Sequence, residues 1–116
     1  MEDTPSTKQD IPQGTLDLMI LQSLAVMGPQ HGFGLARRIE QVSEDSLTLQ
    51  QGTIYPALVR LEKRGWIESE WGVSENKRKA RFYSITRAGR KQLVVETAEW
   101  RRLAGTMARL LQGGVE

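Results

Sequence analysis

The sequence lacks cysteine entirely and contains one histidine, His31, among its 116 residues. A chain without thiols has no disulfide, no thiolate metal site and no thiol redox chemistry, and a lone imidazole leaves a metal or catalytic set short of partners. No apolar run approaches the roughly 20 residues that cross a bilayer. We therefore expect no metal, no cofactor and no membrane partner, and an enzyme is disfavoured.

The amino terminus, MEDTPSTKQD, also lacks an apolar stretch behind a basic cluster, which is the pattern of a secretory signal. We therefore expect a cytoplasmic protein. Residues 1–13 are polar and contain Pro5 and Pro12, which predicts a flexible N-terminal arm. The remaining length suits one domain plus an oligomerising element.

The net charge is small, at +2, but the charges are unevenly distributed along the chain. Residues 1–50 carry three basic and seven acidic side chains, whereas residues 60–91 carry ten basic and four acidic ones. A basic segment on an otherwise acidic or neutral chain suggests one face that binds a polyanion. An ordinary solvated face is the alternative that charge alone leaves open.

The first half of the chain predicts three helices. One spans Leu16 to Met27, with Thr15 as its cap and apolar residues on more than one side. Gly28-Pro29 ends it, and a second helix ends near Val42. The core candidates of that second helix are Phe33, Leu35, Ala36 and Ile39. A third is expected from about Gln51 to Arg64, with Ile54, Leu58 and Leu61 buried and Pro56 in its first turn.

The second half predicts a β-hairpin and a long helix. Residues 66–71 and 80–85 are rich in β-forming and aromatic residues, and the polar, basic stretch 72–79 separates them. Thr86 is expected to cap a last helix over 87–112. The predicted fold is mainly α with a small β-hairpin: a winged helix-turn-helix over 14–86, a C-terminal dimerisation helix over 87–112, and a tail over 113–116.

Four motifs follow this order of elements. The third helix reads QGTIYPALVRLEKRGWI over 51–67, and it is accompanied by GTLDL at 14–18, HGFG at 31–34 and RFYSITRAG at 81–89. Together they resemble the PadR family of transcriptional regulators over about residues 11–100, although Ala80 stands where that family often has proline or a basic residue. The resemblance implies a winged-helix dimer that usually represses transcription, in a compact subgroup whose single C-terminal helix pairs with the partner subunit.

A helix fills the major groove of a duplex, so the exposed face of the third helix is the predicted DNA-reading face. Its candidate residues are Gln51, Gly52, Thr53, Tyr55, Pro56, Val59, Arg60 and Lys63. The hairpin would act as a wing on the DNA backbone or minor groove. Its candidates are Asn76, Lys77, Arg78, Lys79 and Arg81. A Tyr55 that only packs, and a wing that is merely solvated, are the alternatives.

Two other features invite a chemical interpretation. His31 precedes a helix, and capping or packing is favoured over phosphate contact or pH sensing. Glu68 and Glu70 lie on one face of a strand like a paired acid and base, but no nucleophile or pocket accompanies them, so solvent exposure is favoured.

The last helix carries an apolar stripe that predicts a homodimer, with help from the first helix. The candidate interface residues are Leu16, Ile20, Leu93, Trp100, Leu103, Met107 and Leu110. A helix folded back on its own domain is the alternative. Trp100 on this stripe is a candidate site for a planar aromatic effector, or a plain interface anchor.

The sequence thus predicts a repressor that binds double-stranded DNA at an inverted-repeat operator. The runner-up is a winged-helix module that binds protein and does not read DNA, and an enzyme comes third.

Overall fold

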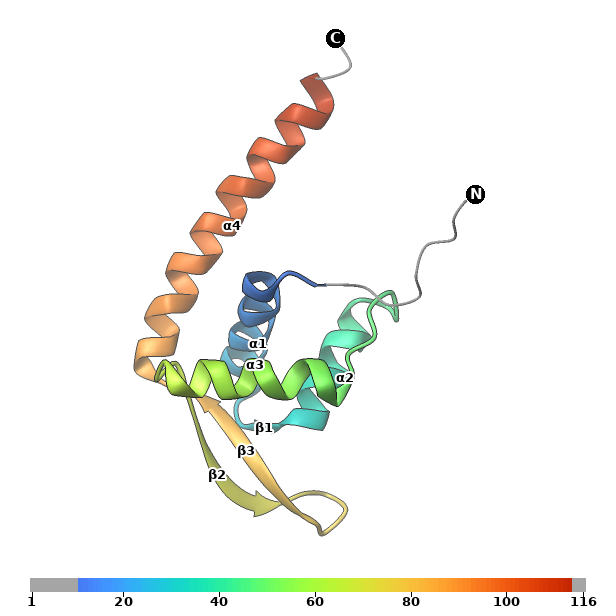
Figure 1. Cartoon of the computed structure of the whole chain (residues 1–116), viewed down its shortest axis with the longest axis vertical. Helices are drawn as coiled ribbons and strands as arrows, with labels where there is room; N and C mark the ends of the chain where they lie inside the picture. The colour runs from blue at the N-terminus through green and yellow to red at the C-terminus, as the bar shows by residue number, and fades with distance from the viewer. Residues whose placement is uncertain (1–10, 114–116) are drawn as a thin grey trace.

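The computed structural model describes residues 11–113 and contains four α-helices and three β-strands (Figure 1). Along the chain these are α1 (Gln13–Met27), β1 (Gln30–His31), α2 (Gly32–Val42), α3 (Gln51–Lys63), β2 (Ile67–Val73), β3 (Lys79–Ile85) and α4 (Arg87–Gly113). The predicted fold class is confirmed: helices dominate, and a small antiparallel sheet forms the wing. Most of the predicted N-terminal arm and of the C-terminal tail lies outside the described residues.

Helices α1, α2 and α3 pack together and form one apolar core. α1 is the central helix of the three, because it has apolar residues on several sides and Ile20, Leu21 and Leu24 are all fully buried. α3 contributes Ile54, Leu58 and Leu61, the buried face that the sequence predicts.

Two details of these helices differ from the predictions. α1 begins at Gln13, with Pro12 at the N-cap position and no side-chain cap, so Thr15 is not its cap. Phe33 is 62% exposed rather than part of the core. It lies in the first turn of α2, where the helix extends beyond the core towards the wing.

The sheet has the strand order β1-β3-β2, so the predicted hairpin gains a third strand. β1 is two residues long and pairs Gln30 and His31 with Tyr83 and Phe82 of β3. So short a strand between a Gly-Pro turn and a helix has no room for an alternating pattern, which is why the sequence does not reveal it.

The register between β2 and β3 separates the wing into two faces. Ser69 lies opposite Tyr83 and Trp71 opposite Arg81 on one face, whereas Glu70 lies opposite Phe82 on the other. At the tip, the Lys77 amide donates to the Ser74 carbonyl at 2.9 Å, and Lys77 closes the turn with a φ of 60°.

α4 has 27 residues and rises away from the domain on the side opposite to the wing (Figure 1). The predicted cap is confirmed, because the Gly89 amide donates to Thr86 Oγ1 at 3.0 Å. Gly89 is the one residue of α4 that is fully buried, and most of the apolar residues beyond it are exposed. Within the described part of the chain, no helix is both long and apolar enough to cross a membrane.

Candidate nucleic-acid interface

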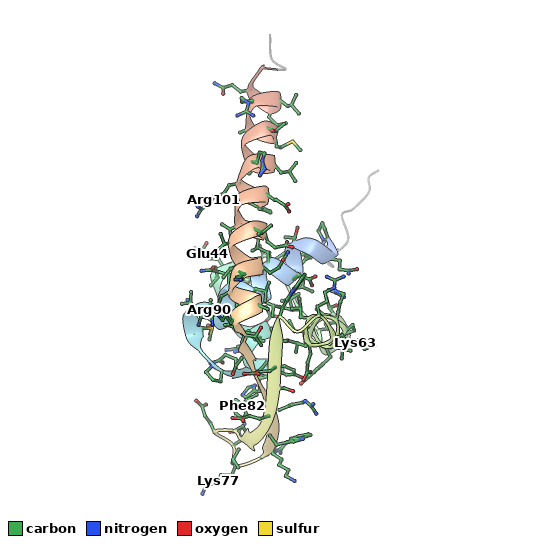
Figure 2. All side chains as sticks on the ribbon, turned by 90° about the vertical axis from the view of Figure 1, so that its left-hand side faces the viewer. Glu44, Lys63, Lys77, Phe82, Arg90 and Arg101 are labelled. Atoms are coloured by element: carbon green, nitrogen blue, oxygen red, sulfur yellow. The ribbon has the colours of Figure 1, made fainter. Side chains whose placement is uncertain are left out.

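The outward face of α3 carries most of the predicted DNA-reading residues. Its exposed side chains are Thr53, Tyr55, Pro56, Val59 and Lys63, and Gly52 lies on the same side. Lys63 projects from the C-terminal end of the helix (Figure 2). Gln51 is the first residue of α3. The outward face of α3 is thus uncharged at its N-terminal end and cationic at its C-terminal end. An uncharged end suits contact with bases in a groove, and a cationic end suits contact with phosphates.

Pro56 lies one turn deeper in α3 than predicted. It is the sixth residue of the helix, where an N–H would normally donate to the carbonyl of Gly52 four residues earlier. Proline has no N–H, so that carbonyl loses its intrahelical donor. Because Gly52 is exposed on the outward face, the carbonyl remains accessible to solvent or to a ligand on this face.

Arg60, a predicted DNA-reading residue, pairs with a carboxylate on α1. Its Nη2 lies 2.5 Å from Oδ1 of Asp17 on α1, and its Nε lies 3.5 Å from Oδ2. Arg64 adds a longer contact, 3.9 Å from its Nη1 to Asp17 Oδ2. Asp17 is only 5% exposed, and a buried carboxylate is costly unless cations pair with it. The guanidinium of Arg60 therefore turns inward towards α1.

Asp17 is a residue that the sequence analysis missed. It is the one charged side chain that is buried in the described chain, and it sits in an otherwise apolar helix. A lone acid in such a helix is a signal for a buried ion pair, and arginines on another helix of the same core were the available partners.

Tyr55 both packs and faces outward. A Cβ on Gly32, the first residue of α2, would come within 3.0 Å of the Tyr55 ring and hydroxyl. The ring therefore lies against the backbone of α2, while 38% of the residue stays exposed. Packing and a role at the outward face are thus compatible for Tyr55.

Most of the predicted wing cations are exposed to solvent. Asn76, Lys77, Arg78 and Lys79 are exposed, and within residues 11–113 the three cations make no ion pair. Figure 2 shows Lys77 at the far tip of the wing.

Arg81 ties the wing to α3. Its Nε donates to Ser69 Oγ at 2.8 Å, and that hydroxyl donates to Glu62 of α3 at 2.7 Å. Its Nη2 lies 3.9 Å from the same Glu62 carboxylate, and its guanidinium lies 5.6 Å from the centre of the Trp71 ring. These contacts fix the angle between the wing and the outward face of α3.

Of the remaining polar candidates, His31 has a structural role, whereas the two glutamates of the wing are exposed. His31 caps α2, as favoured, because its Nδ1 accepts a hydrogen bond from the Gly34 amide at 2.9 Å, and its ring packs edge-on against Phe82. Glu68 and Glu70 are exposed on the wing face that does not contact α3. No group of three or more potential metal ligands occurs among the described residues.

The candidate dimer residues divide into two sets. Leu16 and Ile20 are buried in the core of their own domain, so they have no surface left for a partner, and this part of the prediction is wrong. Leu93 packs partly against the same core. Trp100, Leu103, Met107 and Leu110 are all about half exposed or more.

A helix-turn-helix followed by a basic wing and a long terminal helix defines a winged-helix protein. A family model described as the transcriptional regulator PadR-like family matches residues 20–95. The chain belongs to this PadR family, whose members are DNA-binding transcriptional regulators and not enzymes.

Individual proteins are also similar to this chain in sequence or structure. A transcriptional regulator from Clostridium thermocellum shares 29% sequence identity and a TM-score of 0.75, over 84% of this chain and 93% of that one. A PadR-like transcriptional regulator from Bacillus cereus shares 28% identity and a TM-score of 0.74, over 86% and 94%. An uncharacterised protein from Lysinibacillus sphaericus is 27% identical over 106 residues, which are 91% of this chain and 96% of that protein.

Proposed function

We propose that this chain is a cytoplasmic repressor that binds an inverted-repeat operator as a homodimer. The observation that carries the proposal is the fixed pairing of an exposed α3 face with a cationic wing through Arg81, Ser69 and Glu62. α3 would enter the major groove, and the wing would contact the adjacent backbone or minor groove.

The side chains on this surface divide into readers and anchors. Val59 is exposed and apolar, which suits contact with a thymine methyl group, and Gly52 permits close approach of the backbone. Thr53 and Tyr55 offer hydroxyl groups near the start of α3. Lys63 at the end of α3 and the wing cations suit phosphates. Arg60 is not among the readers, because it is held by Asp17.

The dimer proposal rests on α4. Beyond its base, Trp100, Leu103, Met107 and Leu110 alternate steps of three and four residues, the spacing of a helix that pairs with another helix. They are exposed on a segment that rises away from its own domain (Figure 1). Burying them against a second copy would remove this apolar surface from water, and a two-fold dimer would present two α3 helices to the two halves of an inverted repeat.

Selection of bound sequences from random duplexes tests DNA recognition. We expect an enriched inverted repeat, and weaker binding to it by Lys63→Ala and Lys77→Ala. Each lysine change should also reduce the slope of affinity against salt by about 0.9 if it removes one phosphate contact. Lys91→Ala is the matched control, because Lys91 is an exposed lysine on α4. A selection that enriches no sequence would favour the alternative function, a winged-helix module that binds protein.

Light scattering tests the dimer. The parent chain should have twice the chain mass at micromolar concentration, and Leu103→Glu should give a folded monomer because it places a charge in the apolar stripe. Val94→Glu is the control, since Val94 is equally exposed on α4 but lies off the stripe. A parent that is monomeric while it binds the operator would contradict the proposal.

An effector is proposed at Trp100. A planar aromatic compound between two α4 helices would stack on Trp100 and change the distance between the two α3 helices, provided that it binds one dimer geometry more tightly than the other. In a variant with Trp66 and Trp71 replaced by phenylalanine, Trp100 alone reports binding by fluorescence. Trp100 is a plain interface anchor if no phenolic or drug-like aromatic compound quenches it and operator affinity does not change.

A further inference from the structure

A trough of about 600 Å³ separates the first half of α3 from the wing. It is lined by His31 of β1 and Phe33 at the start of α2, by Tyr55 of α3, and by both strands of the wing with the turn that joins them. The side chains that give the trough its chemistry are Phe33, Tyr55, Trp71, Arg78, Lys79 and Arg81. Only Tyr55 and the wing cations belong to the DNA surface predicted from the sequence.

Trp71 and Phe33 are the unexplained members. Each is 62% exposed, and neither belongs to the buried core. The sheet register places Trp71 beside Arg81 on the wing face that contacts α3 through Ser69 and Glu62. Trp71 therefore borders the trough from the wing, and Phe33 borders it from the start of α2.

The charges around the trough are unequal. Three cations line it, and Glu75 is the single acid among its lining residues. The opposite face of the wing carries Glu68 and Glu70 instead. The wing thus has an aromatic and cationic face towards α3 and an acidic face away from it, which favours an anionic partner on the α3 side.

Geometry and charge identify that partner. If α3 lies in a major groove and the wing in the adjacent minor groove, one sugar-phosphate strand separates the two grooves and must pass between the two elements. We infer that the trough holds this strand, with Trp71 and Phe33 packed against deoxyribose rings and Arg78 and Lys79 on the flanking phosphates. The inference rests on the proposed function and adds two sequence-independent contacts to it.

The test compares aromatic truncations on two duplexes, the selected operator and a shuffled sequence of equal length. Trp71→Ala and Phe33→Ala should each bind both duplexes about tenfold more weakly, a loss of about 1.4 kcal/mol, because each removes a ring that packs against deoxyribose. Neither should change the salt slope, since neither removes a charge, whereas Lys79→Ala should lower it. Val26→Ala is the control, because Val26 is an exposed apolar residue on α1, outside the trough.

A second variant, Trp71→Leu, separates shape from hydrophobicity. It keeps an apolar side chain but loses the flat ring, so it should recover only part of the affinity that Trp71→Ala loses. Thermal unfolding of each variant confirms that the domain is folded, as expected for substitutions of exposed residues.

Several results would overturn the inference. If the parent binds the operator and both aromatic truncations bind it equally well, the trough holds no strand although the proposed function stands. If the loss is confined to one sequence, Trp71 contacts a base and not the backbone. Tighter binding of a single strand than of a duplex, with quenching of Trp71, would assign the trough to stacked bases. A parent that binds no duplex at all overturns both the inference and the proposed function.

Discussion

Arg60 of α3 and Asp17 of α1 form a two-point contact across the core, with Nη2 to Oδ1 at 2.5 Å and Nε to Oδ2 at 3.5 Å. Paired contacts of this kind hold a guanidinium in one orientation. Arg60 lies on the helix proposed to read DNA, and the burial of Ile54, Leu58 and Leu61 sets which side of that helix faces inward. The Arg60–Asp17 pair reinforces this rotation of α3 relative to α1.

Asp17→Asn tests this role in stability. The amide keeps the size of the carboxylate but loses its charge, so Arg60 becomes a half-buried cation without an anion. We expect the free energy of unfolding to fall by roughly 1–3 kcal/mol, the range for a hydrogen bond to a charged group. Urea unfolding measures the change. Glu96→Gln is the control, because Glu96 accepts only a hydrogen bond from Gln92 one turn away on α4. An unchanged midpoint for Asp17→Asn would contradict this role.

Lys77→Gly tests the wing tip. Lys77 has a φ of 60°, a backbone conformation that costs an ordinary residue about 1–2 kcal/mol and glycine almost nothing. The substitution should therefore raise the melting temperature while it weakens DNA binding through the lost cation. Asn76→Gly, at the preceding position with no positive φ, should instead lower the melting temperature slightly. Equal shifts for both variants would show that the turn at Lys77 stores no strain.

The sequence predicts those parts of the fold that depend on local periodicity. Leu58 and Leu61 follow the helical repeat, and Thr86 precedes α4 as a cap, so α3 and the start of α4 were predictable. The direction in which a long side chain points could not be predicted in this way. Arg60 and Lys63 both lie near the polar side of α3, and only the position of Asp17 on another helix decides that Arg60 turns inward.

Phe33 and Trp71 show the same limit. An aromatic residue in an apolar pattern is ordinarily a core residue, and the sequence alone predicts that Phe33 is buried. Its exposure depends on where α2 extends beyond the core, which is set by tertiary packing. Trp71 lies on the same face of β2 as Ser69, as strand alternation predicts. At its position along the wing, that face borders the trough and not the core. The two residues of the proposed strand contact are therefore the ones that only the structure could supply.

Tyr83 gives the fold a dependence on alkaline pH. Burial raises the pKa of its phenol above the usual 10.0, against a smaller opposing effect of Arg81. The folded state therefore holds its proton more tightly than the unfolded state, and this contribution to stability is complete below pH 10.0 and is lost as the pH rises through the folded pKa. Urea unfolding of the parent and of Tyr83→Phe should diverge in this direction above pH 10.0. Parallel curves for the parent and Tyr83→Phe would refute the effect.

Gly89 packs the base of α4 against the turn between α3 and β2 and should be the least replaceable residue of α4. A Cβ at this position would lie 2.0 Å from the carbonyl oxygen of Trp66, which the Thr86 amide already holds at 3.0 Å. Backbone cannot yield as a flexible side chain can, so Gly89→Ala should lower the unfolding free energy by about 3 kcal/mol or more, in the range of severe steric defects. Gly105→Ala in the same helix is the matched control, since its Cβ would meet only Arg109 at 3.6 Å, and removing a mid-helix glycine should stabilise by roughly 0.5–1 kcal/mol. Urea unfolding of the two variants measures both effects, and a Gly89→Ala variant as stable as the parent would show that the base of α4 can move away from Trp66.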